Sequence, residues 1–144
     1  MALHIADYLI IRDEQGQPAN FALPEDDPDR KLAELQIRTF NFSLPSHAAV
    51  GDTGILAYVL DGVPRAGELD IEYDIVINGH SLHRTTRIQS SMTRGLWGLV
   101  RSNWLFESPA ENVLEFQEIR RRSNGGYLTF NNIVLWFQRS VAEP

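Results

Sequence analysis

The chain has 144 residues, a length that suits one domain able to bury a core without disulfides or structural metals. Its net charge of −6 argues against general nucleic-acid binding, because phosphate recognition needs a basic surface. The absence of cysteine excludes a disulfide framework and a thiolate metal site.

The first part of the chain predicts strands joined by polar turns. The apolar run 8–12 predicts a first strand, and the acidic segment 24–30, with its two prolines, predicts an exposed loop. In the segment 32–44 the apolar positions shift by one between Thr39 and Phe40, so we expect a β-bulge or a strand that changes sheets. A helical turn at 32–35 is the alternative for the start of this segment.

The middle of the chain gives the clearest strand signals. The segment 55–60 is almost wholly apolar, which predicts a strand buried on both faces. The segment 70–78 alternates strictly, so it predicts a strand with one buried and one solvated face. One face holds Ile71, Tyr73, Ile75 and Ile77, and the other holds Asp70, Glu72, Asp74 and Asn78. Asn78-Gly79 then supplies a turn that tolerates positive φ.

The last third of the chain continues this pattern. A weakly alternating segment at 82–89 predicts the returning arm of a hairpin, an aromatic stretch occupies 95–106, and a further strand follows at 113–119. The segment 120–126 predicts a basic hairpin loop, and the last strand, 127–139, changes parity at Asn131-Asn132, where we expect a bulge.

Together these signals predict seven to nine strands and no long helix. Turns recur about every 8–12 residues, a spacing typical of all-β sandwiches. We therefore expect residues 1–144 to form a single antiparallel β-sandwich domain of the jelly-roll kind, whose two sheets bury each other's apolar faces.

Three motifs support a family resemblance. They are an alternating strand that ends in an Asn-Gly turn (Ile75–His80), a loop that enters a strand (Ala110–Phe116), and a closing strand (Asn132–Trp136). Their order resembles that of galactose-binding-domain-like jelly-roll β-sandwiches, which are common as carbohydrate-binding modules. The resemblance covers roughly residues 55–138 and implies the fold. Proteins of this architecture bind sugars, peptides, lipid head groups or other proteins, so the fold alone does not fix the ligand.

Aromatic residues near basic and amide side chains are the candidate sugar ligands. Sugar rings stack their C–H faces on aromatic rings, while Arg, Asn and His bond the hydroxyls. We predict a carbohydrate site made of Trp97, Arg94, Arg101, Asn103, Trp104, His80 and His83. The alternative is that the tryptophans belong to the core. Trp136 and Tyr127 are further candidates for sugar stacking. For Trp136, whose parity is opposite to that of Ile133, Leu135 and Phe137, the alternative is a second packed face.

Two further clusters have a chemical and a structural interpretation. His80 and His83 follow a turn and have opposite parity on a strand, so we expect exposed histidines and no metal site. Arg120, Arg121 and Arg122 are candidates for binding a phosphate, sulfate or carboxylate group. The alternative is a solvated loop tip in which Glu118 pairs with one of the arginines.

No catalytic signature stands out. The chain has no Gly-x-Ser-x-Gly elbow. Asp70, Glu72 and Asp74 share a strand face, where i and i+4 lie about 13–14 Å apart and neighbours at i and i+2 about 6.6 Å apart. The shorter spacing is compatible with an inverting acid/base pair. A solvated acidic face is the preferred interpretation, so we expect no enzyme and no cofactor.

The sequence thus favours a noncatalytic binding module with carbohydrate as its ligand. The alternative is a structural or assembly protein that forms a homo-oligomer, or binds a protein or peptide, through a face or edge of the sandwich. That alternative predicts an exposed apolar patch around the tryptophans. We expect no contact with nucleic acid or membranes. The N-terminus has no basic signal-peptide region, so a cytoplasmic location is expected, although an exported domain without its leader would look the same.

Overall fold

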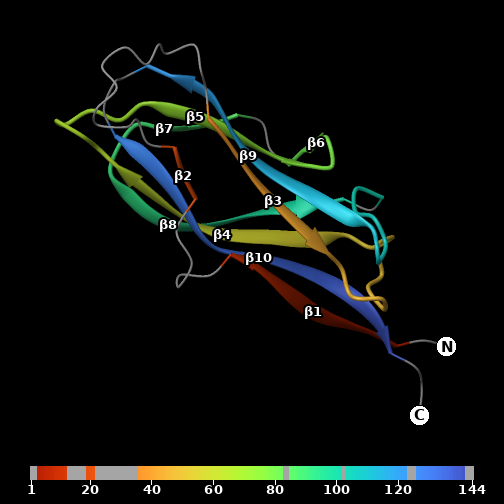
Figure 1. Cartoon of the computed structure of the whole chain (residues 1–144). Helices are drawn as coiled ribbons and strands as arrows, with labels where there is room; N and C mark the ends of the chain where they lie inside the picture. Colours follow the sequence, from red (N-terminus) through yellow and green to blue (C-terminus); the bar gives the residue numbers. More distant parts are fainter. Residues whose placement is uncertain are drawn as a thin grey trace.

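The computed structural model describes residues 3–12, 19–21, 36–82, 85–101, 103–122 and 126–141. These residues form two antiparallel sheets that pack face to face (Figure 1). Sheet A contains β1 (Leu3–Arg12), β2 (Ala19–Phe21), β4 (Gly54–Val63), β8 (Met92–Val100) and β10 (Tyr127–Val141). Sheet B contains β3 (Ile37–Ser43), β5 (Ile71–Ile77), β6 (His80–Ser81), β7 (Thr86–Ile88) and β9 (Glu111–Arg121).

The strand order is that of a jelly roll. Sheet A runs β1-β10-β4-β8, with β2 also on β10, and sheet B runs β3-β9-β5-β6, with β7 also on β5. Since β6 and β7 both pair with β5, they form one interrupted strand. The main strands then pair as nested hairpins, namely β1 with β10, β3 with β9, β4 with β8 and β5 with β6/β7. This nesting confirms the predicted antiparallel jelly-roll sandwich.

The core lies between the sheets, where alternate residues of each strand are buried. On β5, Ile71, Tyr73, Ile75 and Ile77 are fully buried, as the alternation predicted. At the centre the rings of Phe116 and Phe130 lie 4.3 Å apart. The hydroxyls of Tyr58 on β4 and Tyr73 on β5 share a 2.8 Å hydrogen bond that joins the two sheets. Burial, the largest influence, raises the pKa of both hydroxyls.

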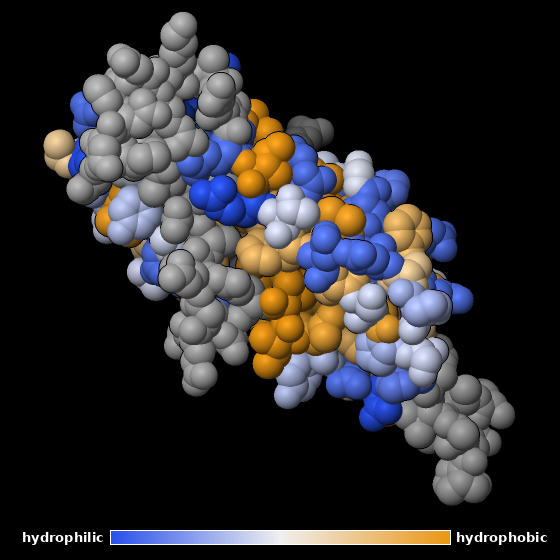
Figure 2. Space-filling model, in the orientation of Figure 1, coloured by the Kyte–Doolittle hydropathy of each residue, from blue (hydrophilic) through white to orange (hydrophobic). Residues whose placement is uncertain are grey.

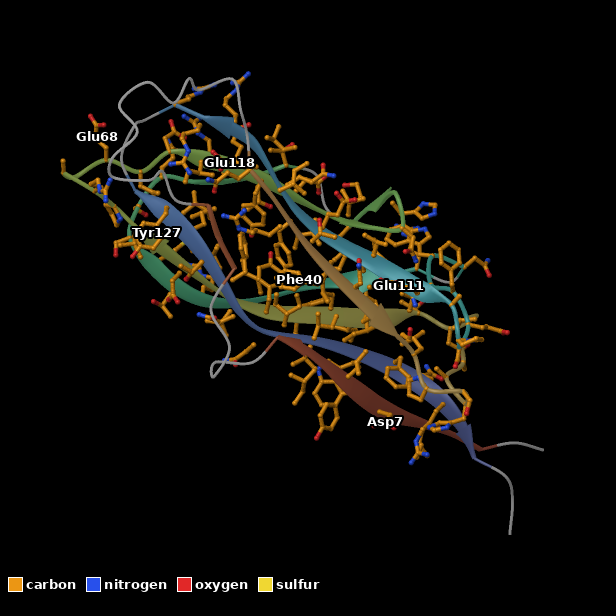
Figure 3. The ribbon with its side chains drawn as sticks, viewed as in Figure 1. Asp7, Phe40, Glu68, Glu111, Glu118 and Tyr127 are labelled. Atoms are coloured by element: carbon orange, nitrogen blue, oxygen red, sulfur yellow. The ribbon has the colours of Figure 1, made fainter. Side chains whose placement is uncertain are left out.

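The first and last strands, β1 and β10, run side by side and are linked by an ion pair. β1 pairs with β10 over most of its length, and the Asp7 carboxylate lies 3.0 Å from the Arg139 guanidinium (Figure 3). Figure 2 views the edge where β1 and β3 are the outermost strands, and a band of hydrophobic side chains runs between them. Leu9, Ile11 and Phe40 pack against the core from these strands. No helix within the described part of the chain is long and apolar enough to cross a membrane.

The expected register slip in the segment 32–44 is wrong for the part that the structure describes. β3 pairs with β9 without a break from Ile37 to Ser43. Phe40 and Phe42 point inward, and Figure 3 shows Phe40 between the sheets. Ile37 is 50% exposed, so the sequence pattern changed because an apolar residue faces solvent, not because the strand is bulged. The start of this segment, the acidic loop 24–30 and His83 lie outside the described residues.

The predicted bulge in the last strand is confirmed. The pairing of β10 with β4 shifts between Asn131 and Val134, and Asn132 has a φ of 49°. Asparagine tolerates this left-handed conformation better than most residues. The extra residue lets Phe130 and Ile133 both face the core although they are three positions apart.

The predicted Asn78-Gly79 turn also anchors the loop between β8 and β9. Both residues have positive φ, as a tight hairpin turn requires. The Asn78 side-chain amide donates to the Trp104 carbonyl at 2.7 Å and to the Asn112 Oδ1 at 2.8 Å. In return the Val113 amide donates to Asn78 Oδ1 at 2.8 Å. These bonds fix the loop between β8 and β9 against the end of sheet B.

Candidate functional site: an aromatic face on sheet A

The central strand of the site is β4, and only one of its faces is buried. Leu56, Tyr58 and Leu60 point into the core. Ile55, with 39% of its surface exposed, and the half-buried Ala57 point the other way. The prediction that this strand is buried on both faces is therefore wrong. Sheet B covers one side of sheet A, and no described strand covers the other.

The outward-facing residues of four neighbouring strands form two rows across sheet A. Residues that pair directly in an antiparallel sheet point to the same face. The register places Tyr8, Trp136, Ile55 and Leu99 in one row. It places Ile10, Val134, Ala57 and Trp97 in the next row. We call these eight residues the aromatic face.

Most side chains of the aromatic face are open to solvent. Trp97 is 63% exposed, Tyr8 53% and Trp136 44%. The rings of Tyr8 and Trp136 lie 5.2 Å apart and are tilted by 47°, so they form a joint aromatic surface. Ile10 and Leu99 are also about half exposed. An apolar surface of this extent marks a binding site more often than an inert surface.

Two depressions lie on this face, and Ile55 and Trp136 line both of them. The larger, of about 380 Å³, is lined by Ile55, Ala57, Trp97 and Trp136. Because β4 lies between β8 and β10, the two indoles rise on either side of the small Ala57 side chain. The smaller depression, of about 160 Å³, is lined by Ala6, Thr53, Ile55, Trp136, Phe137 and Gln138. It therefore places a hydroxyl and an amide beside an aromatic ring.

The opposite end of the same sheet face is polar. Asp61 of β4 pairs with Thr93 on β8 and with Thr129 on β10. Its carboxylate accepts hydrogen bonds from the hydroxyls of Thr93, at 2.7 Å, and Thr129, at 3.3 Å. A ligand that lies along the strands would therefore meet aromatic rings first and a carboxylate beyond them.

The structure divides the predicted sugar-binding residues into separate groups. Trp97 is on the aromatic face, whereas Arg94 has the opposite parity on β8 and points to the other side of the sheet. Arg101, Asn103 and Trp104 follow β8 in the loop at the end of the sandwich. There the Trp104 ring stacks on His80, with centroids 5.1 Å apart and planes within 2°.

Sequence reasoning missed Tyr8 as a member of the site, and it left Trp136 between sugar stacking and a second packed face. The parity of Trp136 was read correctly, and the face that holds it is exposed. The available signal was that β4 and β10 both carry apolar residues at both parities. Such a pattern indicates either burial on two sides or one exposed binding surface, and the sequence does not separate the two.

The three consecutive arginines do not form a common site. β9 continues to Arg121, so Arg120 and Arg121 belong to a strand and not to the expected hairpin loop. The pairing of β9 with β5 passes from Glu118 to Arg120, which leaves Ile119 in a bulge and turns both Glu118 and Arg121 inward. Arg121 Nε donates to Glu118 Oε1 at 2.6 Å, and its Nη1 donates to the Gly126 carbonyl at 3.0 Å.

The exposed arginines at this end of sheet B face carboxylates. Arg87 makes two 2.8 Å hydrogen bonds to Asp70, and its Nε lies 3.9 Å from Glu72 Oε1. In the strand register Glu72 is the backbone partner of Arg120. The hydrogen bond from Arg87, helped by the charges of Arg87, Arg122 and Arg120, holds the pKa of Asp70 below its usual range. Of the three consecutive arginines, Arg121 is therefore paired with Glu118 and buried. In the described part of the chain no three His, Asp or Glu side chains gather as a metal site would require.

Comparisons with known proteins agree on the fold. No protein-family model and no curated protein matches the chain. Dimeric latent PorU from Porphyromonas gingivalis aligns with a TM-score of 0.62 and 12% identity, over 94% of this chain and 13% of that one. BuGH86wt, solved in complex with neoagarooctaose, aligns with a TM-score of 0.50 and 11% identity, over 98% of this chain and 20% of that one.

Carbohydrate-binding modules also occur among the solved structures that were found. CBM28, a module specific for non-crystalline cellulose, aligns with a TM-score of 0.41 and 15% identity, over 81% of this chain and 72% of that one. The resemblance to such sandwiches that three sequence motifs suggested is confirmed at the level of the fold, since the strand order is a jelly roll.

Proposed function

We propose that this chain is a noncatalytic binding module that takes carbohydrate on its aromatic face. One observation carries the proposal: the exposed indoles of Trp97 and Trp136 stand on either side of a depression of about 380 Å³. Flat aromatic rings separated by a shallow hollow suit the C–H faces of sugar rings.

The spacing of the rings supports an oligosaccharide over a single sugar. Trp97 and Trp136 lie on strands separated by β4, and strands in a sheet are about 4.8 Å apart, so the two side chains start about 10 Å apart across the sheet. One sugar ring does not span that distance. Thr53 and Gln138 beside Trp136 offer hydrogen bonds to hydroxyls at one end of such a ligand.

A glycan array followed by calorimetry on the best-bound oligosaccharide tests this function. Trp97→Ala and Trp136→Ala should each lower the affinity about tenfold, because each removes one stacking surface. Phe106→Ala is the matched control, since Phe106 is 51% exposed but lies in the loop after β8, outside the aromatic face. Absence of binding to every glycan, or an equal loss in the control, would contradict the proposal.

A second candidate function is docking of a protein partner on the same face. The aliphatic side chains of Ile10, Leu99 and Ile55 are exposed beside the aromatic rings, and they pack better against another protein than against a sugar. Leu99→Ser separates the two functions. Under the carbohydrate proposal the glycan affinity stays close to that of the wild type, whereas a protein interface would weaken.

A further inference from the structure

Strand β8 has one unpaired edge. All residues of β8, from Met92 to Val100, pair with β4 without a register break. No described strand pairs with the other side of β8. An open edge presents free backbone N–H and C=O groups to another strand. Proteins usually protect such edges with charges, prolines or bulges. β1, at the opposite edge, has a bulge after Ile10, whereas β8 has no bulge, no proline and one charged residue, Arg94.

Gly95 in the middle of this edge strand has no local explanation. Its φ is not in the left-handed region, so the backbone does not require glycine. A Cβ atom built on it meets nothing within 4 Å, so crowding does not require glycine either. Glycine weakens a strand interior and often marks the place where another chain approaches closely. Gly95 lies on the same face of β8 as the exposed Trp97.

We propose that β8 pairs antiparallel with β8 of a second copy of this chain, in a register centred on Leu96. Leu96 is the midpoint of the nine residues of β8, so this register pairs the whole strand with itself. It places Trp97 of each copy opposite Gly95 of the other, and the indole covers the open space beside the glycine. Such pairing of an aromatic ring with a cross-strand glycine is a known stabilising device.

The charges on β8 fit the same register. Arg94 lies opposite Gly98 of the second copy, so no like charges meet. A register centred on Arg94 would instead place the two guanidinium groups face to face, which is destabilising. Because the pairing axis is perpendicular to the sheet, the two aromatic faces lie on the same side. The second copy thus extends the aromatic face with its own Trp97, and the joined sheets present one continuous surface.

Sedimentation velocity and light scattering over a range of protein concentrations test the pairing. The wild type should reach twice the monomer mass at high concentration. Gly95→Lys should remain a monomer, because the new side chain occupies the space of the second copy's Trp97 and two cations approach each other. Gly51→Lys is the matched control, since Gly51 also has open space around its Cβ position and an ordinary φ but lies in a turn. It should dimerise like the wild type.

Ile10→Lys distinguishes edge pairing from stacking of two aromatic faces. Ile10 belongs to the aromatic face on β1, at the edge of sheet A opposite to β8. Edge pairing leaves this variant dimeric, whereas face-to-face association would be lost. A wild type that stays monomeric, or a Gly95→Lys variant that still dimerises, overturns the proposal. Glycan binding is measured separately, so a dimer that binds no sugar counts only against the proposed function.

Discussion

The outer faces of the two sheets differ although their inner faces are alike. On sheet B most outward positions of the central strands carry charged or amide side chains, and two carry valine: Glu72, Asp74, Glu115 and Gln117, with Val76 and Val113. On sheet A the corresponding positions carry the aromatic face, with Tyr8, Trp97 and Trp136 at 44–63% exposure. Both sheets alternate with the same period. The difference shows that the inner residues hold the two sheets together. The outer residues instead indicate whether a sheet faces water or a binding partner.

Exposed apolar area on sheet A has an energetic meaning. Leaving apolar surface in water costs about 25 cal/mol per Å² relative to burying it. A solvated sheet face is stable with polar residues, as sheet B demonstrates, so folding alone does not require tryptophan at these positions. Covering the aromatic face with a ligand or a protein partner would therefore contribute favourably to the free energy of binding.

Removing one partner of the buried ion pair between Glu118 and Arg121 measures how much the inner face of sheet B contributes to stability. Glu118→Ala should lower the free energy of unfolding by about 3–5 kcal/mol, because it leaves the Arg121 guanidinium buried without its carboxylate. Urea denaturation gives this value. Arg120→Ala, on the exposed side of the same strand, is the control and should change stability little. Similar small changes in both variants would show that Glu118 is solvated.

An isoleucine-to-alanine substitution on an inner and on an outer face compares how much a buried and an exposed side chain contribute to the free energy of unfolding. Ile75→Ala removes a fully buried side chain of β5 and should cost about 2–4 kcal/mol. Ile55→Ala removes a side chain that is 39% exposed on the aromatic face and should cost less than half as much. Both values come from urea melts. If the Ile55 variant lost more stability than the Ile75 variant, the assignment of the faces would be reversed.

A hydrophobic dye should report the difference between the outer faces without affecting stability. We expect the native protein to bind anilinonaphthalene sulfonate, and the double variant with Trp97→Ala and Trp136→Ala to lose several-fold in fluorescence. Glu72→Ala on sheet B is the control. It should leave the dye signal unchanged and alter the free energy of unfolding by less than about 0.5 kcal/mol. Equal dye binding by the wild type, the double variant and Glu72→Ala would show that the dye binds outside the aromatic face.

The smallest expected effect concerns the acidic side of the pH profile. The Arg87 hydrogen bonds lower the pKa of Asp70 in the folded state. Ionised Asp70 therefore stabilises the fold above the pKa of the unfolded state, and this contribution disappears as the pH falls through the folded-state pKa. Asp70→Asn should lower the melting temperature slightly near neutral pH and not at strongly acidic pH. In an NMR titration, Arg87→Ala should raise the pKa of Asp70, and an unchanged value would contradict the assignment.

Much of the fold was predictable from strand periodicity. The alternation of β5, the Asn78-Gly79 turn and the bulge at Asn131-Asn132 all appear in the sequence, because each depends on residues close together in the chain. The apparent slip near Thr39 failed because the pattern does not tell an exposed isoleucine from a change of face. The assembly of the site failed for another reason. Tyr8, Ile55, Trp97 and Trp136 belong to four strands, and only their pairing brings them together.

Stacked antiparallel sheets follow from the order of the amino acids alone, because alternation of apolar and polar side chains is a local property of each strand. The same local pattern shows that β4 and β10 are apolar on both sides. Which of those sides became the core depends on the three-dimensional packing, because burial depends on where the other sheet lies. Sheet B packs against Leu56 and Leu135, and the opposite side of the same strands, with Ile55 and Trp136, remains the aromatic face.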